Sequence, residues 1–271
     1  GLVVGGALEL LEAEGDGAQV LGPLFRGEGA LLSMRAGRID RSSIDCTSMQ
    51  CVGYDTGRNT DGYPRSLMGV VAVMRQTFLD AQQHREAKRI YDAWPRGQER
   101  PSDDASLDAL APVVAGSEAV LFETTDVLSV DRTTRVAREF GLKPVLRGSG
   151  DEYKRINLVQ QANAPLILPI AFPDPPALGG PDDERDVSTQ ALRAWDRAPS
   201  NPAKLEKAGV SFAITADLLA DPSLFWAKMR AALARGLSKQ RALAAVTTEP
   251  ARILGVADRL GTIEVGKIAN L

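Results

Sequence analysis

Histidine and cysteine, the residues that most often bind transition metals or act in nucleophilic catalysis, are scarce in this sequence. The 271 residues include one histidine, His84, and two cysteines, Cys46 and Cys51. A structural zinc site needs about four ligands, and a Ser-His-Asp or Cys-His arrangement needs a histidine beside its nucleophile. His84 lies among polar residues within a helical pattern, so we expect a solvated helix residue there. Neither kind of site is therefore predicted from these residues.

Carboxylates that follow apolar runs are better candidates for a functional site. Asp217 comes after the run 210–215, and Glu123 comes directly after the run 119–122. Glu123 and Asp126 together could supply oxygen ligands for magnesium or manganese, and the alternative is that both are solvated loop residues. Asp217 could act at a site, or it could close a strand and cap the following turn.

A glycine-rich turn, Arg147–Asp151 (RGSGD), follows a third apolar run at 144–146. Its backbone N–H groups and the Arg147 guanidinium could bind an anion. The alternative is a tight connection between a strand and a helix, for which glycine is the usual residue. A lone glycine-rich turn is weak evidence for anion binding, so the tight connection is favoured.

The elements that must position these residues alternate along the second half of the chain. Short apolar runs predict buried parallel strands, and the patterns between them predict helices. The predicted strands are 119–122, 144–146, 165–170 and 210–215, and the predicted helices between them are 127–140, 151–162 and 202–208. This alternation of strands and helices is typical of an α/β barrel or an open parallel sheet. No glycine-rich fingerprint of a doubly wound sheet follows a clear strand.

Other segments of the chain show weaker patterns. Apolar residues at helical spacing predict one long helix or two joined helices over 67–94. The stretch 172–200 is rich in proline and glycine, which predicts a long loop or insertion without regular structure. Short helices follow, with Ser238 as an N-cap and Pro250 in a first turn. The last residues, 259–271, predict two short strands hinged at Gly266.

The composition restricts the partners of the chain. A net charge of −3 and 44% apolar residues describe an ordinary globular protein without the basic stripe that nucleic-acid binding needs. No apolar stretch approaches the roughly 20 residues of a membrane span, so we expect none. Cys46 and Cys51 could form a disulfide in an oxidising compartment or remain thiols, which leaves the cytoplasm, the periplasm and secretion open. The oligomeric state is equally open.

A family resemblance is carried by three segments near the end of the chain, Gly236–Ser238, Thr247–Ala251 and Leu260–Leu271. Together they resemble the C-terminal signature of the amidohydrolase superfamily, especially its imidazolonepropionase-like branch. The similarity extends over 104–271 and weakens over the first hundred residues.

This resemblance implies an α/β fold, an incomplete TIM-like (β/α) barrel with the start of a small β-sandwich at the C-terminus. We expect residues 1–256 to form the partial barrel, with 172–200 as a loop or insertion. Residues 257–271 would be the C-terminal β segment of a truncated composite sandwich. Because most of that sandwich is missing, and Gly1 is not a natural start, the sequence resembles a fragment of a longer protein.

The resemblance also implies roles for the candidate residues. Asp217 matches the aspartate after the eighth strand, which in this family binds metal and accepts a proton from water. The fifth and sixth strands of the family carry metal-binding histidines, whereas the matching positions here end in Glu123 and Arg147. We therefore expect Asp217 to be catalytic, Arg147 and Glu123 to bind substrate, and Asp217 with Glu123 to offer the remaining metal ligands. The implied cofactor is zinc or another divalent metal, or none.

Two functions follow from these observations. The first is a metal-dependent hydrolase of non-peptide carbon–nitrogen bonds in cyclic amides or related small molecules, with a degraded or incomplete metal site. The second is a non-catalytic barrel that binds a ligand or partner within a larger protein, which the missing histidines favour.

Overall fold

The structure is a computed structural model, and it describes residues 2–4, 8–12, 24–35, 38–40, 49–54, 64–176, 180 and 187–268. Side chains are described for 24–26, 49–54, 64–176, 180 and 187–268. Cys46, and with it the proposed pairing of the two cysteines, lies outside the described residues. Cys51 is buried, and its thiol lies 3.7 Å from the carbonyl oxygen of Met49.

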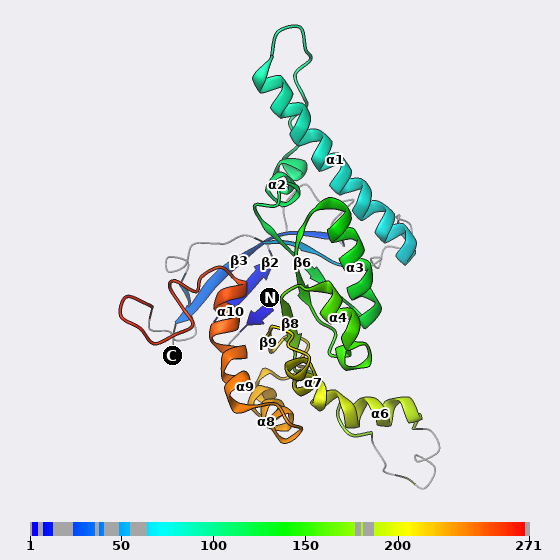
Figure 1. Cartoon of the computed structure of the whole chain (residues 1–271), viewed down its shortest axis with the longest axis vertical. Coiled ribbons are helices and arrows are strands. Elements are labelled where there is room, and N and C mark those ends of the chain that lie inside the picture. Colours follow the sequence, from blue (N-terminus) through cyan, green and yellow to red (C-terminus); the bar gives the residue numbers. More distant parts are fainter. Residues whose placement is uncertain are drawn as a thin grey trace.

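Parallel strands form the centre of a mixed sheet (Figure 1). They lie side by side in the order β5 (Met49–Val52), β6 (Ala119–Glu123), β7 (Lys143–Arg147), β8 (Leu166–Pro169) and β9 (Phe212–Thr215). The last four fall on the four apolar runs predicted as buried strands. The parallel α/β architecture expected from the sequence is thus confirmed.

The strands from the start of the chain are antiparallel to this group. The long strand β3 (Phe25–Arg35) pairs with β5, and β1 (Leu2–Val4) pairs with β9. The strand β2 (Leu8–Glu12) pairs with both β1 and β3, and β4 (Arg38–Asp40) pairs with β3. The parallel strands therefore do not close on themselves as they would in a complete (β/α) barrel, which agrees with the predicted incomplete barrel.

Helices connect the strands and cover the sheet. They are α1 (Leu67–Ala93), α2 (Ala105–Val114), α3 (Val127–Phe140), α4 (Ile156–Ala162), α6 (Thr189–Arg197), α7 (Asn201–Lys207), α8 (Phe225–Ala234), α9 (Lys239–Val246) and α10 (Thr248–Ile253), with short 3₁₀ turns η1 (Glu152–Lys154), η2 (Ala198–Ser200) and η3 (Pro222–Leu224). Local signals fix their ends. For α3, the Asp126 carboxylate accepts a hydrogen bond from the Ser129 N–H, and Gly141 ends the helix with a left-handed φ of 67°.

The core lies on both faces of the sheet, because successive side chains of a strand point to opposite sides. Val120 and Phe122 of β6 belong to a large buried cluster with helix residues such as Phe140. Leu121, between them, belongs to a second cluster that contains Leu254 after α10. Figure 1 shows α3 and α4 on one side of the strands and α10 on the other. The face covered by α10 is the one that carries the candidate site.

Part of the predicted irregular stretch 172–200 is helical. The helix α6 spans Thr189–Arg197, and the Ser188 hydroxyl caps it by accepting a hydrogen bond from the Ala191 N–H at 3.1 Å. The prediction was wrong here because the prolines and glycines are confined to 173–181 and Pro199. The residues between them are free of helix breakers.

The two short strands predicted over 259–271 do not form in the described part of that segment. Residues 257–268 contain turns and bends, and Ile263 and Val265 are exposed. An isolated strand pair needs a partner surface to be stable, and apolar alternation alone does not supply one. The prediction of strands here was therefore wrong for the described residues, and the composite sandwich stays a prediction.

His84 is buried rather than solvated, contrary to the sequence prediction. Its Nε2 lies 3.0 Å from Asp108 Oδ1, and Lys88 Nζ lies 2.7 Å from the same oxygen. Asp108 belongs to α2, which packs against α1 and covers this side of the helix. The polar sequence neighbours of His84 could not reveal that tertiary contact.

None of the described helices combines the length and apolar character that crossing a membrane requires.

Candidate functional site

The candidate site lies at the carboxyl ends of the parallel strands, on the sheet face covered by α10. Glu123 ends β6 and Arg147 ends β7, and the two residues are direct partners in the register of these strands. Each follows by two positions a residue of the buried cluster on that face, Leu121 and Val145 respectively. Side chains two positions apart on a strand share a face. The sequence therefore aims Glu123 and Arg147 at the same side.

Asp217 reaches the same place from the turn after β9. Its backbone N–H donates a hydrogen bond to Oγ1 of the buried Thr215 at 3.1 Å, which folds the chain back at the end of the strand. The next residue, Leu218, has a φ of 65°, a left-handed conformation that leucine rarely adopts. The turn that presents Asp217 is therefore locally strained.

Arg147 and Asp217 form an ion pair. Arg147 Nε donates to Asp217 Oδ2 at 2.7 Å, and Arg147 Nη2 donates to the same oxygen. The two side chains are 13% and 23% exposed, so the pair is only partly accessible to water. Partial burial makes such a pair stronger than one on the open surface. The structure thus joins two of the three residues singled out from the sequence.

Glu123, the third residue, is paired with an arginine that sequence reasoning missed. Arg26, near the start of β3, places Nη1 at 3.4 Å from Oε1 and Nη2 at 3.2 Å from Oε2 of Glu123. The Glu123 side chain is 15% exposed. No sequence pattern linked Arg26 to Glu123, because the two residues meet only through the antiparallel pairing of β3 with the sheet.

The glycine-rich turn after β7 is filled by a carboxylate of the chain itself. Glu152 is fully buried, and its Oε1 accepts hydrogen bonds from the N–H groups of Ser149 at 2.6 Å and Gly150 at 3.1 Å. Asn201 Nδ2 donates to Glu152 Oε2 at 2.7 Å and to the Gly150 carbonyl at 3.0 Å. A Cβ at Gly148 would lie 2.6 Å from Glu152 Oε1, so the turn needs glycine there. The tight connection is thus the alternative that the structure shows.

The residues present do not fit a divalent metal. Within the described part of the chain, no group of three or more His, Cys, Asp or Glu side chains is arranged to hold one. Glu123 and Asp217 each face an arginine. Asp126 caps α3 instead, accepting from Ser129 N at 2.6 Å. Burial alone would raise the pKa of Asp126, but the hydrogen bonds from Ser129 outweigh it and hold that pKa below its usual value.

A cavity of about 440 Å³ borders the same end of the sheet. Its walls come from the turn after β7, from the segment after β8 and from α6, through residues that include Ser149, Lys154, Phe172 and Gln190. A volume of this size suits a small molecule. The segment after β8 and the helix α6 thus contribute walls of a pocket that also touches the turn after β7.

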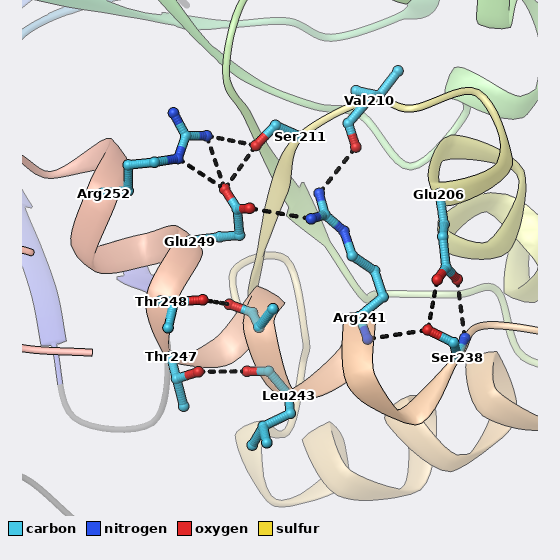
Figure 2. A network of polar contacts seen from close by, with 11 residues as sticks. Glu206, Val210, Ser211, Ser238, Arg241, Leu243, Thr247, Thr248, Glu249 and Arg252 are labelled. Atoms are coloured by element: carbon cyan, nitrogen blue, oxygen red, sulfur yellow. Dashed lines mark hydrogen bonds and ion pairs between the residues drawn. The ribbon is translucent and has the colours of Figure 1, made fainter. Parts of the chain in front are cut away.

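A second polar network lies at the opposite end of β9, where the C-terminal signature residues gather (Figure 2). Glu249 of α10 accepts a hydrogen bond from the Ser211 hydroxyl at 2.7 Å and from Arg241 Nη1 at 3.1 Å. Arg252 Nη2 donates to Glu249 Oε2 at 2.8 Å. The Arg241 guanidinium also stacks 4.6 Å from the ring centre of Phe212 and donates to a backbone carbonyl. These residues join α9 and α10 to the start of β9, which is a structural role.

The fold and the site together define an incomplete parallel barrel whose charged side chains gather at the carboxyl ends of its strands. Residues 193–271 match the sequence model of the amidohydrolase family. The amidohydrolase from Thermotoga maritima MSB8 is similar in structure, with a TM-score of 0.71 and 21% sequence identity over 90% of this chain and 61% of that chain. These findings confirm the resemblance to the amidohydrolase superfamily and the fold class expected from it.

More distant matches add no argument about the fold. A prolidase complexed with n-methylphosphonate-l-proline matches with a TM-score of 0.43 and 20% identity, over 59% of this chain and 40% of that chain. An adenosine deaminase from Xanthomonas campestris with bound zinc matches with a TM-score of 0.32 and 19% identity, over 82% of this chain and 52% of that chain. A comparison with curated proteins found no match. The match to this chain covers 61% of the length of the Thermotoga protein.

Proposed function

We propose that this chain forms the barrel part of a small-molecule hydrolase of the amidohydrolase type. Its reaction is hydrolysis of carbon–nitrogen bonds other than peptide bonds, in cyclic amides or related molecules. The observation that carries the proposal is that Asp217, the residue matching the family aspartate, meets Arg147 at the carboxyl ends of the strands, the end where barrel enzymes place their sites. Residues 1–256 constitute the barrel in this proposal, and 257–271 belong to a separate C-terminal segment.

The chemistry of the site suits an amide. An amide group presents a carbonyl oxygen, which accepts hydrogen bonds, next to a nitrogen that often carries a proton. Arg147 donates hydrogen bonds to Asp217 from Nε and Nη2. Among the described residues, none accepts a hydrogen bond from its Nη1. That nitrogen is the donor we assign to a substrate carbonyl oxygen. Glu123 and Asp217 are the acceptors for substrate N–H groups, and Asp217 is the carboxylate that takes a proton during hydrolysis.

A metal has no assigned step in this proposal. Related hydrolases use a bound divalent ion to ionise the attacking water. Here the described residues offer Glu123 and Asp217, and both are paired with arginines. Zinc or another divalent metal therefore does not fit the site formed by these residues.

Substitution of Asp217 tests the hydrolase proposal. The purified chain is incubated with a panel of cyclic amides, imides and N-acyl amines, and products are followed by liquid chromatography with mass detection. Asp217→Asn should lower the rate on the preferred substrate by about 10²–10⁴-fold, the usual contribution of a general base.

The matched control is Asp221→Asn, four positions further along the chain. Asp221 caps η3 on the surface by accepting from Ser223 N at 2.9 Å, and we place it outside the site. This variant should keep the parent rate. A parent that hydrolyses none of the panel, or an Asp217→Asn variant with full activity, would contradict the proposal.

A non-catalytic barrel that binds a small ligand is the second candidate. The observation that favours it is the guanidinium held against Asp217, because Arg147 occupies the carboxylate oxygen Oδ2 that would accept a proton during hydrolysis. In that case, members of the same panel would raise the melting temperature of the chain without being consumed.

A further inference from the structure

We infer that Arg147 is a built-in counter-cation of Asp217, so that a protein guanidinium takes the role of a divalent metal at the carboxyl ends of these strands. The chain then folds, and keeps this end of its sheet in place, with no metal bound there. The inference goes beyond the proposed function, since it concerns the charge balance of the site and holds whether or not hydrolysis is found.

The geometry of the pair supports this assignment. Two nitrogens of the Arg147 guanidinium donate to one carboxylate oxygen, Oδ2 of Asp217, one of them at 2.7 Å. A zinc ion bound by a carboxylate lies about 2.0–2.2 Å from its oxygen. The guanidinium therefore covers the approach to Oδ2 that a metal would need. An ion bound to this oxygen would have to compete with an arginine whose side chain is only 13% exposed.

The neighbouring charges oppose a metal in the same way. Glu123, the register partner of Arg147, faces the guanidinium of Arg26 at 3.2 Å. The row of side chains thus reads Arg26, Glu123, Arg147 and Asp217, with two positive and two negative charges. Each carboxylate in this row is already paired with a guanidinium, so the four side chains together offer a divalent cation no net negative charge.

The backbone that carries Arg147 is fixed on both sides. Its carbonyl oxygen accepts hydrogen bonds from Thr124 N at 2.9 Å and Thr124 Oγ1 at 2.7 Å. The next residue, Gly148, donates its N–H to the Ile167 carbonyl at 2.8 Å. Beyond it, the buried Glu152 carboxylate holds the turn. The ion pair therefore extends from a rigid strand end, which limits the entropy lost in forming it.

Metal titration of the chain tests the inference. Chelator-treated parent protein, the Arg147→His variant and the Arg147→His/Asp217→Asn double variant are titrated with Zn²⁺ and Mn²⁺ by calorimetry. We expect no one-to-one binding by the parent. Arg147→His removes the guanidinium and adds an imidazole ligand, so it should bind about one equivalent of Zn²⁺, at least about tenfold more tightly than any weak binding by the parent. Adding Asp217→Asn should abolish this gain.

The matched control is Arg252→His, which alters another arginine–carboxylate pair, with Glu249 at 2.8 Å. Arg252→His should bind Zn²⁺ no better than the parent. One equivalent of Zn²⁺ or Mn²⁺ bound by the parent and lost in Asp217→Asn would overturn the inference.

A second measurement keeps the inference testable should Arg147→His fail to fold. The melting temperature of the parent, measured with and without EDTA, should be the same, whereas a fall with EDTA that Asp217→Asn removes would overturn the inference. These readouts do not use hydrolysis. Turnover without metal would support both proposals. A metal-free chain that is inactive would contradict only the proposed hydrolase function. Turnover that requires a metal bound at Asp217 would contradict only the inference about Arg147.

Discussion

Arg147 and Asp217 approach each other from β7 and from the turn after β9, 70 positions apart in the chain. Each residue by itself has an ordinary alternative role, a surface cation or the cap of a turn. Their contact gives both a specific role, because each neutralises the other in a partly buried place. Removing one partner would leave the other charge with poorer compensation, which costs more than losing both together.

A double-mutant cycle measures this coupling. Asp217→Asn and Arg147→Met should each lower the free energy of unfolding by about 1–3 kcal/mol, and the double variant should lose less than the sum. The measurement is urea unfolding followed by circular dichroism.

The pair Arg75–Glu139 provides the control for this cycle. It is an exposed ion pair with side chains 51% and 40% accessible, and its coupling should be about 0–1 kcal/mol. An Arg147–Asp217 coupling no larger than that of the exposed pair would contradict a structural role for the site pair.

At the scale of elements, the polar network around Glu249 holds the C-terminal helices α9 and α10 against β9. Burial by itself would raise the pKa of Glu249, but the hydrogen bonds from Ser211 and Arg252 and the charge of Arg241 outweigh it and leave that pKa below its usual value. The signature segment Thr247–Ala251 thus carries the family resemblance through residues that hold α10 against β9. This network lies at the start of β9, whereas Asp217 of the candidate site follows the end of the same strand.

The lowered pKa of Glu249 predicts a pH dependence of stability. Since the folded-state pKa lies below the ordinary value of 4.5, the carboxylate stabilises the fold above that pH, and this contribution is lost as the pH falls through the folded-state pKa. Glu249→Gln should therefore lower the free energy of unfolding by about 1–2 kcal/mol at neutral pH, and the difference from the parent should shrink on acidification.

Unfolding curves of the parent and the variant across the acidic range provide the measurement. Arg252→Gln removes one donor to Glu249 and should reproduce part of the effect. A constant difference between parent and Glu249→Gln at every pH would show that the Glu249 charge has no part in it.

At the scale of the whole molecule, the sheet needs cover on both faces. The large cluster on one face is built by α1 to α4 and α7 to α9, and the smaller cluster on the other face depends on α10 and the residues that follow it. Leu260 is buried in that smaller cluster, whereas Val265, five positions later, is exposed. Among the described residues, the last buried apolar side chain is thus Leu260, and the exposed C-terminal segment begins before Val265.

Leu260→Ala should lower the free energy of unfolding by about 2–4 kcal/mol, because it leaves a cavity in the smaller cluster. Val265→Ala is the control on the exposed side and should change it by less than about 0.5 kcal/mol. Thermal and urea unfolding of both variants would measure the difference. Equal effects of the two substitutions would contradict the boundary of the core at Leu260.

The parallel strands and most helices could be predicted from sequence because their signals are local. The run 119–122 and the helix 127–140 are recovered within a residue, since apolar periodicity, the cap at Asp126 and Gly141 all lie inside the segment. The position of Glu123 and Arg147 at strand ends follows from the same signals. The strands predicted over 259–271 failed because pairing depends on a partner elsewhere.

Local pattern alone determined which residues stand at the strand ends and which family the C-terminal segment resembles. Only the tertiary structure decided that Arg147 neutralises Asp217, that Arg26 reaches Glu123, and that α2 buries His84. The physical reason is the distance along the chain over which each interaction acts. Hydrophobic periodicity and helix capping act over a few residues, whereas an ion pair at a sheet edge depends on how distant segments are brought together in space.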